Sequence, residues 1–113
     1  MAFDAVFKNG TRASDKFFTY IALPNTLGHA RLGIAVSKKS LRRAVDRNRT
    51  KRIIRESFRH SSVRNIPMDI VVLARNPVAG QSAQSLSKAL SERWPTLIIF
   101  HNRLTSSPTG KPL

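Results

Sequence analysis

The most informative part of the chain is the segment KKSLRRAVDRNRTKRIIRESFR, residues 38–59. It holds ten of the twenty lysines and arginines of the chain but only two acids, Asp46 and Glu56. It contains no glycine or proline after Leu41, and most of its residues are acceptable helix formers. The sequence therefore predicts a long basic helix that ends near residues 60–62.

The predicted helix has two unlike faces when its residues are placed at about 100° intervals. The inward face contains Thr50, Ile53, Ile54 and Ser57, with Phe58 at its border. The outward face contains Asn48, Lys51, Arg52, Arg55 and Arg59, with Arg47 and Arg49 on its two flanks. Like charges on one helical face repel by a few tenths of a kcal/mol per pair. A helix with so few acids of its own is therefore suited to bind an external polyanion.

The composition of the whole chain supports a nucleic-acid partner. The 113 residues carry a formal charge of +14, and 41% of them are hydrophobic, as expected of one folded domain. A charge of this size predicts nucleic acid or an anionic membrane as the partner. The membrane is disfavoured because no apolar run approaches ~18–20 residues and because Thr50 and Ser57 interrupt the apolar face of the basic helix. With no cysteine and no signal-peptide layout, the expected location is cytoplasmic.

Short sequence patterns around the basic helix predict an α+β domain. Residues 3–8 (FDAVFK) predict a short helix that Asn9 and Gly10 end. The predicted strands are residues 11–14, 17–23, 31–37 and 68–74. In residues 31–37 one face carries only Gly33, Ala35 and Ser37, which permits close approach of a helix or of another backbone.

The C-terminal part predicts a second helix over residues 82–94, which Pro95 interrupts. Residues 96–100 fit either a short helix or an edge strand. The sequence thus predicts one domain over residues 1–104, with a central sheet of three to four strands packed by helices. It predicts a disordered tail over residues 105–113.

Residues for catalysis are scarce, whereas residues for binding RNA are abundant. His29, His60 and His101 are scattered, and the six acids form no paired or metal-binding pattern. Arginine holds phosphate through two hydrogen bonds, and the amide of Asn48 can donate to and accept from a base edge. Aromatic rings beside a cationic track stack on unpaired bases. The candidate rings are Phe3, Phe7, Phe17, Phe18 and Tyr20.

The segment AVDRNRTKRIIRESFR, residues 44–59, closely resembles the RNR signature of the protein subunit of bacterial ribonuclease P. Three further segments are similar to the same family: FDAVFK at residues 3–8, RLGIAVSKK at 31–39 and MDIVV at 68–72. The resemblance implies a fold like domain 2 of ribosomal protein S5. In this fold the basic helix lies in a left-handed βαβ crossover, against the usual right-handed rule.

The resemblance also implies a function in which the catalyst is a large RNA. That RNA removes the 5′ leader of precursor tRNA by metal-dependent hydrolysis, with Mg²⁺ bound mainly by the RNA. The protein is the non-catalytic subunit of this endoribonuclease and binds both the catalytic RNA and the leader. No protein ligand cluster for a metal, no small-molecule substrate and no membrane partner are expected.

Site residues follow from position in the family pattern. The leader is expected in a cleft between the basic helix and the sheet, lined by Phe3, Phe7 and Ile21 and walled by Arg47, Asn48, Lys51 and Arg55. Because some members carry a ring where this chain has Ile21, Phe17 or Tyr20 is expected to take over stacking. The catalytic RNA is expected on Arg31, Lys38, Lys39, Arg42, Arg43, Arg49, Arg52 and Arg59. Thr50 departs from the aliphatic residue usual there, the basic N-terminal arm of many members is missing, and the stretch LIIF is unusually apolar.

Two other classes of protein remain open at this stage. A non-enzymatic RNA-binding protein of ribosomal type would share the charge and the steep salt dependence of binding, but would not assist cleavage. A self-contained nuclease is disfavoured because the sequence lacks an acid-base or metal constellation. Cleavage of precursor tRNA by the protein and magnesium without any RNA subunit would support the nuclease.

Overall fold

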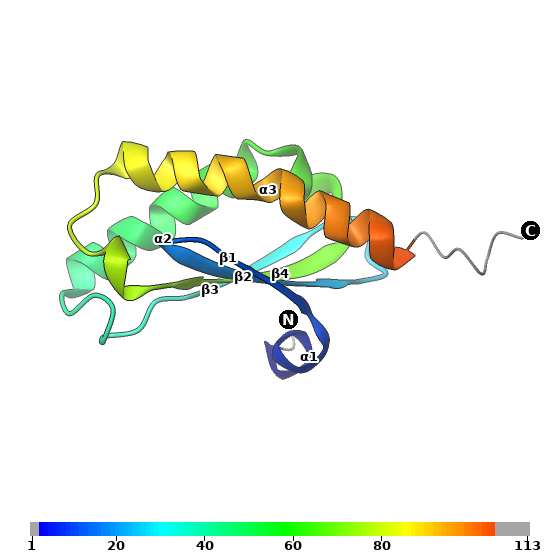
Figure 1. The fold of residues 1–113 in the computed structure, drawn as a ribbon, viewed down its shortest axis with the longest axis horizontal. Coiled ribbons are helices and arrows are strands. Elements are labelled where there is room, and N and C mark those ends of the chain that lie inside the picture. Colours follow the sequence, from blue (N-terminus) through cyan, green and yellow to red (C-terminus); the bar gives the residue numbers. More distant parts are fainter. Residues whose placement is uncertain (1–2, 106–113) are drawn as a thin grey trace, which may run out of the picture.

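A four-stranded sheet separates two layers of helices in the computed structural model, which describes residues 3–105 (Figure 1). Helices α2 and α3 cover one face of the sheet, and the short helix α1 lies under the other face. The elements in chain order are α1 (Phe3–Asn9), β1 (Thr11–Ser14), β2 (Phe18–Pro24), β3 (Arg31–Ala35), α2 (Ala44–Arg59), the 3-10 turn η1 (Ser62–Asn65), β4 (Met68–Ala74), the 3-10 turn η2 (Asn76–Val78) and α3 (Ala83–Thr105).

The strand order in the sheet is β1-β2-β4-β3. Strand β2 pairs antiparallel with β1 and with β4, whereas β3 runs parallel to β4. A parallel pair needs a long connection, and here α2 supplies it. The α+β class, all four strands and the βαβ unit that carries the basic helix are therefore confirmed.

Each face of the sheet has its own hydrophobic cluster. Phe18, Tyr20 and Val72 point toward α2 and α3 and are fully buried. On the opposite face, Val6 of α1 packs on Ile21 and Val71, which are also fully buried. Because side chains of a strand alternate between faces, the two clusters use alternate residues of the same strands.

Trp94 of α3 is the side chain that joins α2 to the sheet. Its indole N–H donates a hydrogen bond of 2.9 Å to Oγ of Ser57 on α2. Its ring meets Tyr20 of the sheet edge-on at 5.9 Å and Phe58 of α2 at 6.0 Å. Edge-to-face aromatic pairs at such distances add to the stability that burial provides. These contacts hold the inward face of α2, where Thr50 and Ile54 are buried as the sequence predicts.

Helix α3 is longer than the sequence predicts. Helix α3 continues through Pro95 to Thr105, so the predicted interruption is wrong and the predicted tail begins within the last turn of a helix. Pro95 lies on the exposed side of α3, while Trp94 and Leu97 on either side of it are buried. Burial of these neighbours offsets the loss of one backbone hydrogen bond. Residues 106–113 lie outside the described part of the chain.

The connection between β3 and α2 is longer than predicted. Strand β3 ends at Ala35 and helix α2 begins at Ala44, so Lys38, Lys39, Arg42 and Arg43 lie in a loop or at its end. Leu41 is buried in the main core and fixes the middle of this loop. The backbone N–H of Leu41 also donates to the carbonyl of Ser37. The loop is thus held at one apolar residue while its cations face outward.

Within residues 3–105, no helix combines the length and the apolarity that crossing a bilayer requires.

Gly10 provides a test of how α1 is seated on the sheet. A Cβ atom added at Gly10 would lie 2.5 Å from the carbonyl oxygen of Val6 and 2.6 Å from Cγ2 of Ile21. Neither atom can move aside easily, because the first belongs to the backbone and the second to a fully buried side chain. We therefore expect Gly10→Ala to destabilise the protein by about 1–3 kcal/mol. Urea unfolding measures the change, with Lys8→Ala on the exposed side of α1 as the control. A Gly10→Ala protein as stable as the wild type would show that α1 can shift without cost.

Candidate nucleic-acid interface

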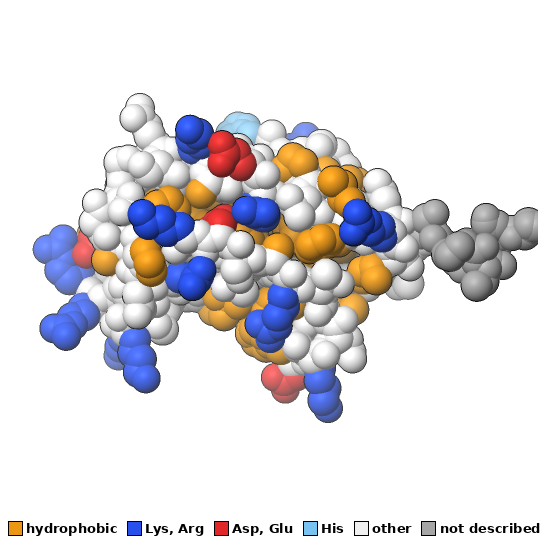
Figure 2. Space-filling view, in the orientation of Figure 1, with side chains coloured by type: hydrophobic (Ala, Val, Ile, Leu, Met, Phe, Trp, Pro, Cys, Tyr) orange, Lys and Arg blue, Asp and Glu red, His pale blue; other side chains and the backbone are white. Residues whose placement is uncertain are grey.

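The outward face of α2 is a row of exposed cations, as its sequence predicts. Arg49, Arg52, Arg55 and Arg59 are exposed, as is Asn48, while Arg47 and Lys51 are partly buried. In Figure 2, blue Lys and Arg side chains also stand out from the end of the molecule where the loop before α2 lies in Figure 1. Such a surface attracts a polyanion over a distance of about 10 Å at 0.1 M salt.

A groove of 430 Å³ runs between α2 and the outer edge of β3. Its floor is apolar and consists of Leu32, Ile34 and Phe58. Lys51, Arg55 and Arg59 of α2 form its cationic side. An apolar floor beside cations matches a nucleotide, because the base can pack on the floor while the phosphate meets the ammonium and guanidinium groups.

A second and more polar hollow of 620 Å³ lies at the start of α2. Its cations are Lys39, Arg42, Arg43 and Arg49, all of which the sequence assigns to the catalytic RNA. Asp46 also lines it and pairs with Arg43 at 3.0 Å. This hollow suits a phosphate backbone more than a base, since it is lined mainly by charged and polar groups.

The opposite wall of this hollow is formed by Val78, Ala79, Gly80 and Gln81, which the sequence analysis did not assign to the site. Arg49 donates a hydrogen bond of 3.4 Å to the carbonyl of Gln81 and so bridges α2 to the loop before α3. In its sequence, this segment indicates only a turn at Gly80, and the structure confirms the turn with φ +79° at this residue. A turn by itself does not show that the loop faces α2.

The two phenylalanines of α1 lie on the other face of the sheet. The rings of Phe3 and Phe7 meet edge-on at 6.3 Å, and Phe3 is 37% exposed. Strand β3 lies between these rings and the Lys51 groove, because α1 contacts β2 and β4 whereas the groove borders β3. The predicted leader residues therefore form two patches on either side of an edge strand.

Two of the rings and side chains predicted to contact the leader do not reach the surface. Ile21 is fully buried beneath Val6 of α1, so the prediction that it lines the cleft is wrong. Tyr20 is wrong for a different reason: it faces α3, on the opposite side of the sheet, and its hydroxyl donates to Asp15. Burial, together with the Asp15 carboxylate, raises the pKa of the Tyr20 hydroxyl. Phe17 is half-buried against the main core, with the ammonium of Lys16 5.7 Å from its ring centre.

Several of the predicted RNA-binding arginines have partners within the protein, and Arg31 and Arg47 each make two hydrogen bonds there. Arg31 donates to both carboxylate oxygens of Asp69, at 2.8 and 2.7 Å, and Asn25 donates to the same carboxylate at 2.9 Å. Arg47 donates to the carbonyls of Leu41 and Arg42, at 2.9 and 2.7 Å. Arg31 thus joins β3 to β4, and Arg47 fixes the loop that precedes its own helix. Both side chains therefore have a structural role in the protein before any RNA is bound.

These features define a class: a small, basic, single-domain protein whose βαβ unit presents a cationic helix to a nucleic acid. In the part of the chain that the structure describes, no three His, Cys, Asp or Glu side chains group as metal ligands. The architecture therefore offers surfaces that bind phosphates and bases, built mainly from α2, its preceding loop and β3.

Comparison with known proteins identifies the family. The family model for ribonuclease P matches residues 1–97. The ribonuclease P protein component of Methylococcus capsulatus is 46% identical over 92 residues, which cover 81% of this chain and 72% of the relative. That of Photorhabdus laumondii is 45% identical over 92 residues, with 81% and 77% covered. The chain belongs to the ribonuclease P protein family, and the resemblance found in the basic helix is confirmed.

Solved structures agree with this assignment. The RNase P protein of Staphylococcus aureus superposes with a TM-score of 0.75 at 33% identity, covering 85% of this chain and 87% of that chain. The RNase P protein from Thermotoga maritima gives a TM-score of 0.70 at 28% identity, covering 80% and 90%. Family and fold therefore lead to one conclusion: the chain is a protein component of ribonuclease P, which acts in tRNA processing.

The ion pair between Arg31 and Asp69 makes the stability of the folded protein depend on pH. Hydrogen bonding by Arg31 holds the pKa of the Asp69 carboxyl below its usual value. A lowered folded-state pKa adds stability above the unfolded value near 3.9, and this stability is lost as the pH falls through the folded value. We expect Asp69→Asn to be less stable than the wild type at pH 7 in urea unfolding, with the difference shrinking below about pH 4. Equal pH profiles for the two proteins would contradict this role of Asp69.

Proposed function

We propose that this chain is the subunit that holds the 5′ leader of precursor tRNA and docks on the catalytic RNA, in a cytoplasmic holoenzyme whose RNA cleaves. The groove between α2 and β3 is the observation that carries the proposal. It places Lys51 and Arg55 beside an apolar floor, which is the combination that an unpaired nucleotide requires. A ribosomal-type RNA-binding protein would need the cations, but it would not need to raise the rate of leader removal.

The leader path that fits the described surface crosses β3. It begins on the α1 face at the exposed ring of Phe3 and the half-buried ring of Phe7, which are positioned to stack on bases. By their pairing with Val71 and Leu73, Gly33 and Ala35 share this face, where neither carries a side chain larger than a methyl group. The path ends at Lys51 and Arg55 in the groove, with Asn48 one turn before on the same helix.

The catalytic RNA is assigned to the start of α2 and to the outward side of this helix, between its β3 and α3 flanks. Arg42, Arg43 and Arg49 with Lys39 surround the polar hollow, and Arg52 continues the row along α2. Lys38 and Arg59 extend this surface at its two ends. Arg59 lies 3.5 Å from Glu56 and also borders the leader groove, so it stands at the boundary between the two RNAs.

The magnesium that the reaction implies is assigned in this proposal mainly to the RNA. No step in the proposal passes through a metal held by the protein. What the protein contributes is charge that offsets repulsion between the leader phosphates and the catalytic RNA.

Leader cleavage at low magnesium tests the proposal. We expect this protein to restore cleavage of precursor tRNA by a bacterial ribonuclease P RNA, because its cations replace part of the magnesium. The triple variant Arg47→Ala, Lys51→Ala, Arg55→Ala should lose about tenfold or more, since the groove loses two phosphate contacts and the loop before α2 loses the hydrogen bonds of Arg47. The matched control is Lys16→Ala, Lys88→Ala, Arg103→Ala, which removes the same charge from exposed positions outside α2.

Three outcomes would count against the proposal. Tight binding to the RNA without any effect on cleavage would favour the ribosomal-type alternative. Equal losses in the two triple variants would show that total charge matters and that the groove does not. Cleavage by the protein and magnesium alone would show that the chain is itself a nuclease.

Anions should stabilise the free protein. With a charge of +14, self-repulsion opposes folding, and an anion that binds the folded state offsets it. At about ten times its Kd, sulfate should add about 1.4 kcal/mol, which raises the melting temperature by several degrees above that in chloride at equal ionic strength. Equal melting curves in the two salts would contradict a preformed anion site.

A further inference from the structure

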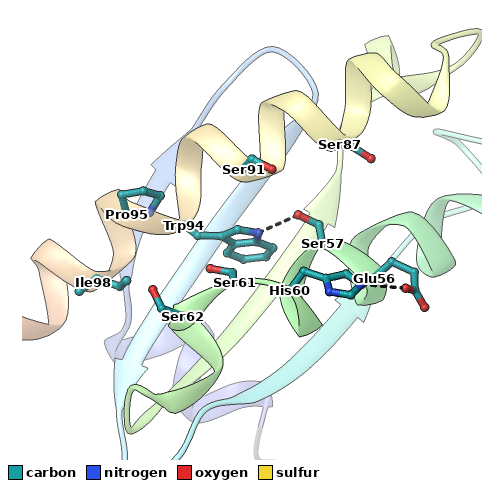
Figure 3. A pocket seen from close by; sticks show the side chains of 10 residues that line it. All are labelled: Glu56, Ser57, His60, Ser61, Ser62, Ser87, Ser91, Trp94, Pro95 and Ile98. Atoms are coloured by element: carbon teal, nitrogen blue, oxygen red, sulfur yellow. Dashed lines mark hydrogen bonds and ion pairs between the residues drawn. The ribbon is translucent and has the colours of Figure 1, made fainter.

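A third groove lies on the flank of α2 that faces α3, and it differs chemically from the two RNA-facing hollows. It has a volume of 450 Å³ and lies between the C-terminal half of α2 and the middle of α3 (Figure 3). Its α2 side includes Glu56 and His60, one turn apart, and its α3 side includes Ser87, Ser91 and Pro95 at the same spacing. Trp94 lies between the two helices.

The groove is rich in groups that accept hydrogen bonds. Ser57 accepts from Trp94 and Ser61 accepts from the backbone of Val63, so these two hydroxyls are engaged. In the described part of the chain, the hydroxyls of Ser87 and Ser91 make no hydrogen bond to protein. The backbone carbonyl of Ser91 is a second acceptor. Pro95, four residues later in α3, has no N–H that could donate to it.

The groove lacks the lysines and arginines that line the other two hollows. No lysine or arginine lines it, although the chain carries +14 overall. Its one carboxylate, Glu56, lies 3.5 Å from both Arg59 and His60, and its side chain is 49% exposed. Pairs that are this long and this exposed are weak, so the carboxylate remains available to a further cation.

We propose that this groove binds an arginine side chain on an extended segment of a partner protein. A guanidinium group offers five N–H donors and a positive charge, which match Glu56 and the free acceptors of Ser87 and Ser91. The methylene stem of arginine can pack on Pro95 and Ile98, which supply the apolar part of the lining. RNA fits less well, because its phosphates would approach Glu56 where no cation lines the groove.

The groove can be occupied while RNA is bound to the leader groove. Lys51 and Arg55 line the β3 flank of α2, whereas Glu56 and His60 line the α3 flank. The inference therefore goes beyond the proposed function and does not depend on it. It assigns the two flanks of one helix to partners of opposite charge.

Trp94 is the only tryptophan of the chain and lines this groove, so its fluorescence reports on binding there. The probe is the N-acetylated, C-amidated tripeptide glycine-arginine-glycine, titrated into the full chain, with the citrulline tripeptide as its uncharged control. We expect saturable change with a Kd on the order of 1 mM for so small a probe. The citrulline peptide should bind more weakly, and Glu56→Gln should weaken the arginine peptide by about two- to fivefold.

The matched control is Glu92→Gln, which removes an equal charge from an exposed residue of α3 outside the groove lining. A second variant, Ser91→Leu, fills the groove and should abolish the signal, with far-UV circular dichroism to verify the fold. Equal binding of the arginine and citrulline peptides, or equal losses in the two glutamate variants, would overturn the proposal. A fluorescence change with oligouridylate that strengthens in Glu56→Gln would also overturn it and assign the groove to RNA.

Discussion

The structure depends on how α2 is docked, because one helix has to bury an apolar side and display a dense row of cations. Thr50 and Ile54 are buried, and Trp94 fixes the helix through its hydrogen bond to Ser57 and its contact with Phe58. This docking sets the rotation of α2 about its axis. A rotation of one residue, about 100°, would turn Lys51 away from the apolar floor of its groove. Core packing on one side of the helix therefore determines which cations meet which partner.

The basic residues of this family member do not all serve RNA directly. Arg31 and Arg47 use their guanidinium groups to fix a strand pair and a loop, and Arg43 pairs with Asp46. Most other cations of α2 lie on its outward side, where a polyanion can reach them. Asp15 and Asp69 hold the scaffold through several hydrogen bonds each, while the surplus of positive charge remains for binding. Glu56 differs from both, since it borders a groove that no lysine or arginine lines.

Local patterns were sufficient to predict the elements, and long-range pairing explains what they missed. The four strands and both faces of α2 follow from hydrophobic periods of two and about 3.6 residues, which depend only on residues close together in the sequence. The burial of Ile21 and Tyr20 could not be predicted from these periods. Both faces of β2 carry apolar side chains, and the sequence alone does not show that helices cover both faces. The role of Arg31 depends on Asp69, 38 residues further along the chain. Pro95 was misread because the buried residues around it, Trp94 and Leu97, outweigh its local preference.

In the proposed arrangement, adjacent residues of α2 face different RNAs, and directed cleavage of RNA from single cysteines can distinguish them. The chain has no cysteine, so Lys51→Cys and Arg52→Cys each give one attachment point for an iron chelate that cuts nearby RNA. In the holoenzyme with bound precursor tRNA, we predict cuts in the leader from position 51 and cuts in the catalytic RNA from position 52. The same cutting pattern from both positions would contradict the account, because it would show that the docking of α2 does not separate the two partners.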